Sequence, residues 1–289
     1  MSSLGPRPSR ASAAESSKPR PDYDGLIVDL DGVVWLGGEP IEGAVEAIAA
    51  LRAHGVRLLF LTNDPSSSRA EQAARLTAIG VPAGAADVMT SAAATARFLA
   101  GRAELSGCPA FVIGSPSFQR ELAHAGFELV PAAAARTARV VVVGGHEGFD
   151  FAELRAATRA LANGAQLYAA GRDRVVPTAD GPEPATGAIL AAVETAAGIT
   201  ATVVGKPEPF MFELAREALP ECKRVAVVGD NLASDIAGAK RSGLDAILVL
   251  TGTSTEADLR KADYAPDLVL ASLAELATRF DPKREKAGA

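Results

Sequence analysis

The chain has 289 residues, of which 48% are hydrophobic and 5% aromatic, so we expect one large or two ordinary domains with an aliphatic core. Its net charge of −6 gives no support to nucleic-acid binding, which needs a basic face. The sequence also lacks an apolar run near the roughly 20 residues of a membrane span. We therefore expect a cytoplasmic protein with neither a nucleic-acid nor a membrane partner.

Both ends of the chain are polar. Residues 1–21 are rich in Ser, Pro and Arg without the apolar segment of a secretory signal, which predicts a disordered leader. Residues 281–289 are expected to form a flexible tail. Cys108 and Cys222 lie far apart and match no metal or redox spacing, so we interpret them as buried thiols in a reducing compartment.

The first predicted strand lies within residues 26–34 (LIVDLDGVV), where large apolar residues lead into two carboxylates. A short β-branched run is typical of a buried strand in a parallel sheet. Open α/β sheets bind ligands outside the carboxyl ends of their strands, so Asp29 and Asp31 lie where such folds usually have their active sites. Gly32 lets the backbone approach a ligand closely. A bound cation would offset the repulsion between the two acids, and the alternative is a strand that ends in an acidic turn.

Strands and helices alternate along the rest of the chain, which favours parallel sheets with right-handed crossovers. After a glycine-bearing loop at 35–40, the predicted strands are 56–62, 110–113, 140–143, 166–170, 202–204, 224–228 and 246–250. The predicted helices are 43–54, 71–79, 117–125, 151–162, 188–197 and 234–242, with another that starts near residue 209. These strands are too many for one compact sheet, so we expect two α/β units.

Polar groups at three later strand ends would complement the first pair of acids. Thr62 and Asn63 offer a hydroxyl and an amide suited to phosphate oxygens, although an ordinary turn is equally consistent. Lys206, between a glycine and a proline, can point its charge at a phosphate, and the alternative is a surface lysine. Asp230 follows an apolar strand, whereas Asp235 lies where it could instead stabilise a helix dipole.

Together, the motifs D-x-D-G-V, S/T-N, G-K-P and G-D-x-x-x-x-D resemble those of the haloacid dehalogenase superfamily of phosphatases. More narrowly, the chain is similar to the branch of 4-nitrophenylphosphatases, phosphoglycolate and glycerol-3-phosphate phosphatases and NagD-type nucleotide phosphatases. The distinctive stretches are DLDGVVWLGGEPIEGA, TSAAAT, PATGAI and VVGKPEPFMFELA. The resemblance implies a Rossmann-like, doubly wound parallel-sheet core formed by residues 22–84 and 188–280, with a large α/β cap, residues 85–187, inserted into it.

The resemblance also implies a mechanism. Asp29 would be the nucleophile that forms an aspartyl-phosphate, and Asp31 the general acid and base. Mg²⁺ would be held by Asp29, the backbone carbonyl of Asp31 and Asp230, with Asp235 orienting metal-bound waters.

The transferring phosphoryl group would be bound by a second set of residues. Thr62, the Asn63 backbone and Lys206 would balance the charge on its oxygens.

The predicted cap would determine the substrate. Its loop at 169–173 (AAGRD) stands where this branch usually has A-T-N-x-D, so Gly171 replaces an Asn whereas Asp173 is kept. That departure argues against carrying over the substrate of any relative. Arg172 and Arg174 would either bind a second anion or a polyol or lie in solvent as surface arginines.

Two further positions have open interpretations. His146 follows the strand at 140–143 and either faces the cleft or is a structural residue. Asp64 stands where the branch commonly has a second Asn.

The interpretation that we favour is that the protein is a Mg²⁺-dependent phosphatase of small sugar, glycerol, glycolate or nucleotide phosphates. A phosphotransferase or phosphomutase would use the same intermediate but exclude water. A phospho-acceptor module would also combine acids with a Thr and a Lys, but the second acid, Asp31, and the insertion argue against it. An NAD-dependent enzyme is disfavoured because no G-x-G-x-x-G follows any of the strands. A homodimer is left open.

Overall fold

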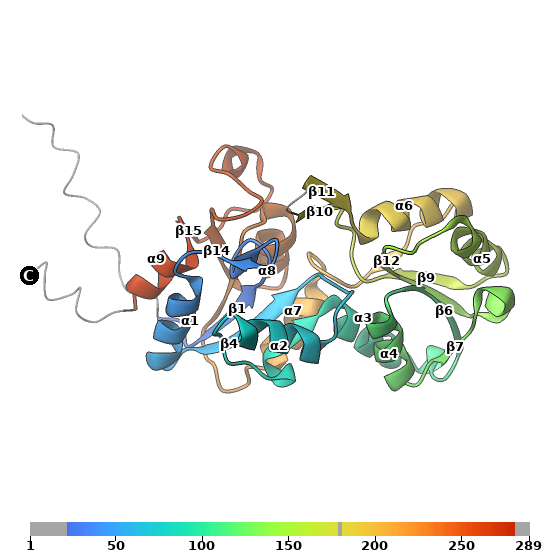
Figure 1. The fold of residues 1–289 in the computed structure, drawn as a ribbon, viewed down its shortest axis with the longest axis horizontal. Helices are drawn as coiled ribbons and strands as arrows, with labels where there is room; N and C mark the ends of the chain where they lie inside the picture. The colour runs from blue at the N-terminus through green and yellow to red at the C-terminus, as the bar shows by residue number, and fades with distance from the viewer. Residues whose placement is uncertain (1–21, 179–180, 281–289) are drawn as a thin grey trace, which may run out of the picture.

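Two parallel sheets organise the computed structural model, which describes residues 22–178 and 181–280 (Figure 1). The larger sheet has the strand order β15-β14-β13-β1-β4-β5, and the smaller one has the order β12-β9-β8-β6-β7. The predicted leader (1–21) and tail (281–289) lie outside the described residues. The two sheets and their helices confirm the predicted α/β core with an inserted parallel-sheet cap.

The strands of the larger sheet are β1 (Gly25–Asp29), β4 (Arg57–Thr62), β5 (Val88–Thr90), β13 (Val225–Gly229), β14 (Asp245–Val249) and β15 (Leu268–Leu270). Those of the smaller sheet are β6 (Pro109–Gly114), β7 (Glu128–Leu129), β8 (Val140–Gly145), β9 (Gln166–Ala169) and β12 (Thr202–Val203). Two hairpins add β2 (Trp35–Leu36) with β3 (Glu39–Pro40), and β10 (Val175–Thr178) with β11 (Gly181–Pro184). The loop predicted at 35–40 is therefore the β2–β3 hairpin.

The helices are α1 (Ala44–Ala53), α2 (Arg69–Ala78), α3 (Ser91–Ala100), α4 (Pro116–His124), α5 (Phe151–Ala162), α6 (Thr186–Ala197), α7 (Pro209–Glu217), α8 (Ala237–Arg241) and α9 (Leu273–Thr278). A π-helical turn, Leu232–Ile236, precedes α8, so the helix predicted at 234–242 is partly π-helical. Within the described ranges, no helix combines the length and apolarity needed to cross a membrane.

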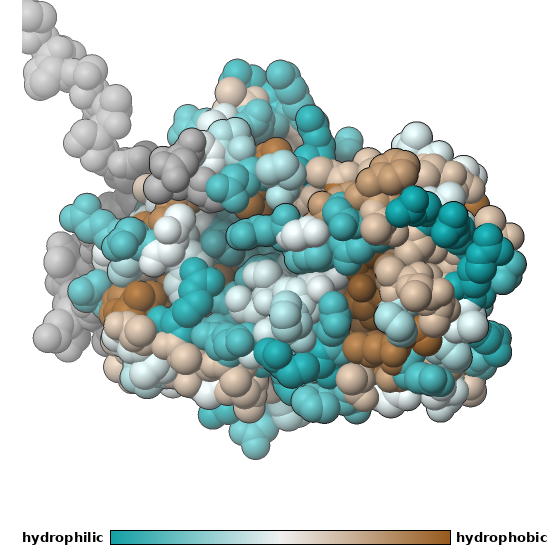
Figure 2. Space-filling model, turned by 45° about the vertical axis from the view of Figure 1, so that its right-hand side comes forward, coloured by the Kyte–Doolittle hydropathy of each residue, from teal (hydrophilic) through white to brown (hydrophobic). Residues whose placement is uncertain are grey.

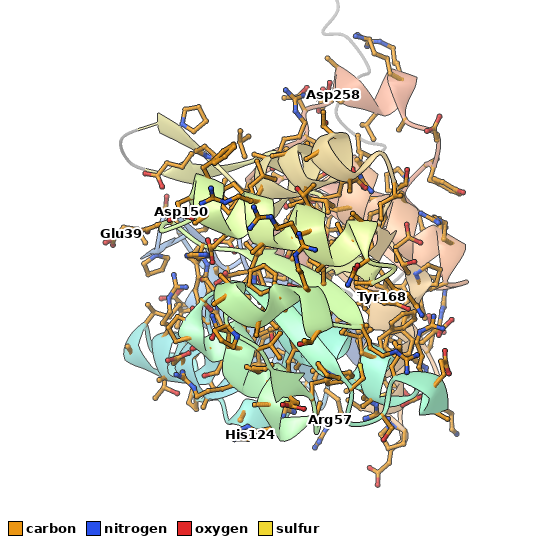
Figure 3. The ribbon with its side chains drawn as sticks, turned by 90° about the vertical axis from the view of Figure 1, so that its right-hand side faces the viewer. Glu39, Arg57, His124, Asp150, Tyr168 and Asp258 are labelled. Carbon is orange, nitrogen blue, oxygen red and sulfur yellow. The ribbon has the colours of Figure 1, made fainter. Side chains whose placement is uncertain are left out.

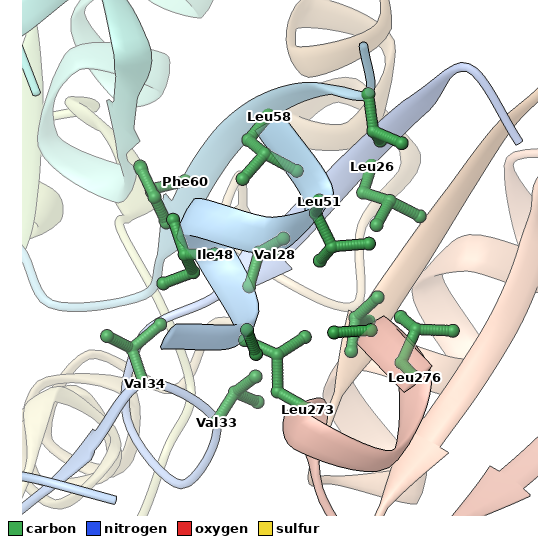
Figure 4. Close-up of a cluster of buried hydrophobic side chains, with 14 of the residues drawn as sticks. Leu26, Val28, Val33, Val34, Ile48, Leu51, Leu58, Phe60, Leu273 and Leu276 are labelled. Carbon is green, nitrogen blue, oxygen red and sulfur yellow. The ribbon is translucent and has the colours of Figure 1, made fainter. Parts of the chain in front are cut away.

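The central strand of the larger sheet, β1, is buried along its whole length because helices cover both faces. Its side chains alternate, as the period of a strand requires. Leu26 and Val28 pack with residues of α1 and α9 on one face (Figure 4), whereas Ile27 packs on the other face with residues of α7. Because helices cover both faces of the sheet, the sequence of β1 is a continuous apolar run.

The smaller sheet is built in the same way. Val141 and Val143 of β8 pack with α5 and α6, whereas Val140 and Val142 pack with α3 and α4. Figure 3 looks onto this end of the molecule, where Asp150 precedes α5 and accepts a hydrogen bond from the backbone N–H of Glu153 (2.8 Å).

Sheet membership differs from the predicted division at residues 85 and 187. β5 pairs with β4 in the larger sheet although it lies within 85–187. β12 pairs with β9 in the smaller sheet although it lies beyond residue 187. The reason is the order of the strands along the chain. The chain adds β5 to the larger sheet before it enters the smaller one, and it adds β12 to the smaller sheet before it returns to the larger one. The assignment of whole ranges to domains stays a prediction.

The surface shown in Figure 2 is mostly hydrophilic or mixed, with separate apolar patches. Few large apolar side chains are exposed in the described part of the chain. They are Leu36, Phe151, Val175, Val176, Ile199 and Tyr264.

Candidate active site

A buried lysine lies between two acids at one edge of the larger sheet. Lys206 Nζ lies 2.8 Å from Asp29 Oδ1 and 2.6 Å from Asp235 Oδ1. Asp29 is the last residue of β1, and Asp235 lies in the π-helical turn that follows β13, the parallel neighbour of β1. Three segments that are far apart in the sequence therefore meet at the carboxyl edge of the larger sheet, as the motifs predicted.

The charges of this cluster change the pKa values of its members. Burial raises the pKa of Asp29, and the nearby Asp235 carboxylate raises it further. Burial alone would lower the pKa of Lys206, but the charges of Asp235 and Asp29 outweigh that effect and raise it. The lysine therefore stays protonated, and the surplus of negative charge remains on the acids.

Asp230 completes a cluster with the donor set of a hard cation. Carboxylate oxygens of Asp29, Asp230 and Asp235 lie within 4.8 Å of one another, and all three side chains are buried. Burial raises the pKa of Asp230, again with a contribution from Asp235. A divalent cation would offset this repulsion, and carboxylate oxygens with retained waters are what Mg²⁺ prefers. The residues present thus fit the predicted metal.

Two glycines make room for the Asp230 side chain. A Cβ at Gly32 would lie 2.5 Å from the Asp230 carboxyl carbon, and one at Gly252 would lie 2.1 Å from Asp230 Oδ2. Gly32 also has a φ of +79°, a conformation that side chains rarely adopt. Gly32 was expected to let the backbone approach a ligand, and the structure shows that it makes room for the Asp230 side chain. The role of Gly252 was missed because its neighbours, Thr251 and Thr253, give no sign of a contact with Asp230.

The loop after β4 holds Lys206 from the other side. Thr62 Oγ1 accepts a hydrogen bond from the backbone N–H of Asp64 (3.0 Å). The Asn63 side chain accepts a hydrogen bond from Lys206 N (2.8 Å) and donates one to Lys206 O (3.1 Å). Ser91 Oγ donates to the Asn63 carbonyl (2.7 Å), a contact that sequence reasoning missed. The Asn63 amide thus positions the lysine main chain, and contacts of this loop with a phosphoryl group stay a prediction.

One residue of the predicted cap loop reaches this site, and another is paired elsewhere. Asp173 Oδ2 accepts a hydrogen bond from Asn63 Nδ2 (2.7 Å), which links the smaller sheet to the larger one. Arg172 instead forms two hydrogen bonds to the Glu194 carboxylate of α6, at 2.7 and 2.8 Å. Arg174 is exposed. The structure therefore brings Asp173, but not the Arg172 guanidinium, to the acidic cluster.

Asp31 faces the solvent side of the same sheet edge. Its Oδ1 accepts a hydrogen bond from the Trp35 indole Nε1 at 3.0 Å. Desolvation by the surrounding protein raises the pKa of Asp31, and the indole hydrogen bond acts in the opposite direction. Trp35 belongs to the β2–β3 hairpin, which the sequence did not predict.

The two positions with open interpretations have local partners. His146 Nε2 lies 2.9 Å from Glu153 Oε2 in the first turn of α5, which fits the structural interpretation. Asp64 accepts hydrogen bonds from Ser66 N (2.7 Å) and Gln72 Nε2 (2.8 Å), so it fixes the start of α2.

The chain is similar to known proteins along most of its length. The family model for haloacid dehalogenase-like hydrolases matches residues 26–128, and a HAD-hydrolase-like model matches residues 203–276. The sugar phosphatase AraL of Bacillus subtilis is 35% identical over 87% of this chain and 91% of its own length.

Two solved structures are similar along most of the chain. The glycerol phosphate phosphatase of Mycobacterium tuberculosis, in complex with magnesium, has a TM-score of 0.82 and 35% identity over 88% of this chain and 76% of its own. The p-nitrophenyl phosphatase of Archaeoglobus fulgidus has a TM-score of 0.81 and 33% identity over 89% and 99%. With its strand-end motifs gathered around one acidic cluster, the chain belongs to the haloacid dehalogenase-like hydrolases, in the branch of the p-nitrophenyl and glycerol phosphate phosphatases.

Proposed function

We propose that this protein is a Mg²⁺-dependent phosphatase that hydrolyses small organic phosphate monoesters through a phosphorylated Asp29. The observation that carries the proposal is the buried contact between Asp29 and Lys206 beside the acids Asp230 and Asp235. In this proposal one site thus combines a nucleophile for phosphorus, a cation for the phosphoryl oxygens and a set of metal ligands. Catalysis of phosphoryl transfer depends mainly on such positioning and charge balance.

In the first step, a carboxylate oxygen of Asp29 attacks phosphorus. The bond from phosphorus to the ester oxygen breaks as the bond to Asp29 forms. Asp31, protonated at this stage, gives its proton to the departing alkoxide, so the alcohol leaves neutral.

In the second step, Asp31 is a carboxylate and takes a proton from water. The water oxygen attacks phosphorus, the bond between phosphorus and Asp29 breaks, and phosphate is released with Asp29 restored. Lys206, Thr62 and the Asn63 backbone hold the phosphoryl oxygens in both steps.

We assign the metal to Asp29, the Asp31 backbone carbonyl and Asp230, where Mg²⁺ would neutralise charge on the phosphoryl oxygens. Both carboxylate oxygens of Asp235 already accept hydrogen bonds, one from Lys206 Nζ (2.6 Å) and one from Asn231 N (3.1 Å). We therefore assign Asp235 to orient metal-bound water rather than to bind the metal directly.

The substrate is proposed to be a small phosphate ester that fits beneath the smaller sheet. Similar proteins include a sugar phosphatase and a glycerol phosphate phosphatase, so these two classes are the first candidates. Asp173 would contribute to substrate binding because it lies against Asn63. Arg174, exposed on the same loop, is the cation that we assign to a polar or anionic substrate group. A cytoplasmic location and a homodimer stay predictions.

The test is a panel of about fifty phosphorylated metabolites, assayed for released phosphate with Mg²⁺. We expect turnover of sugar, glycerol, glycolate or nucleotide phosphates. Hydrolysis in ¹⁸O-labelled water should place one label in each phosphate released. Transfer of the phosphoryl group to an acceptor alcohol without label from water would instead identify a phosphotransferase.

A further inference from the structure

We propose that Trp35 is a positioning residue for Asp31 and fixes which oxygen of that carboxyl group transfers the proton. This inference rests on the proposed function, in which Asp31 is the general acid. Trp35 Nε1 donates to Asp31 Oδ1 at 3.0 Å. An indole N–H can only donate, so Oδ1 remains an acceptor whether or not Asp31 is protonated. In a protonated carboxyl group the carbonyl oxygen is a better acceptor than the hydroxyl oxygen, so this bond favours the transferable proton on Oδ2.

The indole ring is held in place from several sides. Trp35 is 1% exposed and packs in the cluster that contains Val28 and Phe60. Its carbonyl accepts a hydrogen bond from Gly32 N (2.7 Å), and its N–H donates to Leu30 O (3.2 Å). Main-chain hydrogen bonds thus close the turn between Asp31 and Trp35. They hold the indole N–H at a constant position relative to the Asp31 carboxylate.

The ring is also tied to the loop after β4. The Arg75 guanidinium of α2 lies over the indole, 4.6 Å from its centroid, and Arg75 donates to Gln72 Oε1 (3.3 Å). Gln72 Nε2 donates to Asp64 Oδ2 (2.8 Å). This chain of contacts connects Asp31 to the loop that holds Lys206. A role in packing alone would not require Trp35 to connect Asp31 with the loop after β4.

Asp31 is exposed, unlike Asp29, and so depends on a specific contact for its orientation. A carboxylate at the edge of a crevice can rotate, and a misplacement of about 1 Å can cost about 100-fold in rate. Removal of the indole N–H should therefore weaken proton delivery while leaving the nucleophile and the phosphate-binding residues in place.

The test compares two leaving groups in the full-length protein. An alkyl phosphate needs a proton on its departing oxygen, whereas p-nitrophenolate leaves without one. The ratio of kcat/KM for the two substrates reports the first step, in which the leaving group departs. In Trp35→Phe, kcat/KM for the alkyl phosphate that the wild type hydrolyses fastest should fall about 10- to 100-fold. The value for p-nitrophenyl phosphate should change by less than about threefold.

Two controls bracket this result. Asp31→Asn should lower the alkyl-to-aryl ratio at least as much as Trp35→Phe. Phe60→Leu removes aromatic packing from the same hydrophobic cluster without touching Asp31, and it should leave the ratio unchanged. A ratio that falls in Asp31→Asn but not in Trp35→Phe would overturn the inference alone. A ratio unchanged in Asp31→Asn would overturn it together with the role of Asp31 as the acid.

A second measurement does not depend on the folding of Trp35→Phe. The sequence contains one tryptophan, so ¹⁵N-labelled wild-type protein gives one indole N–H signal. In Asp31→Ala this signal should move upfield because the hydrogen bond is lost. A signal at the wild-type position would show that the two side chains are not in contact and would overturn the inference.

Discussion

Lys206 Nζ lies 2.8 Å from Asp29 Oδ1, and both side chains are buried at the edge of the larger sheet. The group that we assign to the phosphoryl oxygens is therefore already beside the group that we assign to attack phosphorus. A second acid, Asp235, holds the same ammonium at 2.6 Å. In the proposed function the lysine has two tasks, to bind the phosphoryl group and to neutralise the buried acids, and stability measured without substrate isolates the second.

Lys206→Met should be unstable as well as inactive. Removing one partner of a buried charge cluster leaves uncompensated carboxylates, which costs about 3–5 kcal/mol of unfolding free energy. Lys240→Met is the matched control, because Lys240 pairs with Asp267 at a partly exposed site, where the loss should be at most about 1 kcal/mol. Denaturant unfolding in EDTA measures both. Equal losses in the two variants would argue against a buried cluster.

Mg²⁺ should stabilise the protein as well as activate it. A ligand that binds only the folded state adds about 2.7 kcal/mol at 100 times its dissociation constant. Thermal unfolding should therefore shift upward with Mg²⁺ in the wild type and much less in Asp230→Asn, which lacks one of the clustered carboxylates. EDTA should abolish phosphate release and added Mg²⁺ should restore it. An identical Mg²⁺ shift in Asp230→Asn would contradict the assignment.

The metal-free protein should lose stability as pH rises from acidic values. Burial raises the pKa of Asp29 above its ordinary value of 3.8, so between these two pKa values the folded state binds more protons than the unfolded state. The free energy of unfolding then falls with rising pH over that window. Asp29→Asn should show a shallower fall, and the difference between the two curves isolates this group. Parallel curves for the two proteins would exclude a raised pKa at Asp29.

Asn63→Ala should weaken phosphate binding through Lys206. The Asn63 amide bonds both the N–H and the carbonyl of Lys206, so its loss frees the lysine main chain. We expect affinity for vanadate, a phosphate analogue, and kcat to fall by about 10- to 100-fold. Asn163→Ala removes an exposed amide that also bonds a backbone carbonyl, but far from the site, and it should have no effect. Unchanged vanadate affinity in Asn63→Ala would disprove the positioning role.

The meeting of Asp29, Lys206, Asp230 and Asp235 could be predicted from the sequence. Each lies at or near the end of an apolar run, and parallel strands place their carboxyl ends at one edge of a sheet. The order of strands was not needed for that step. The same argument predicted two α/β units, because the number of apolar runs exceeded what one sheet would hold.

Contacts between side chains of distant segments could not be predicted in this way. The bond between Asn63 and Asp173 joins residues 110 positions apart, and its existence depends on how the two sheets pack. The pairing of Arg172 with Glu194 depends on the position of α6 in the same way. Short strands such as β7 and β15 were missed because two or three residues do not show a period.

The central claim is that Asp29 carries the phosphoryl group during turnover. Asp31→Asn should retain the first step with p-nitrophenyl phosphate, which needs no acid, but lose the base for the second step. Rapid acid quenching with peptide mass spectrometry should then find a phosphoryl group on Asp29, and Asp29→Asn should show none. Steady release of phosphate in Asp29→Asn within about tenfold of the wild-type rate, or a phosphoryl group on another residue, would contradict the account.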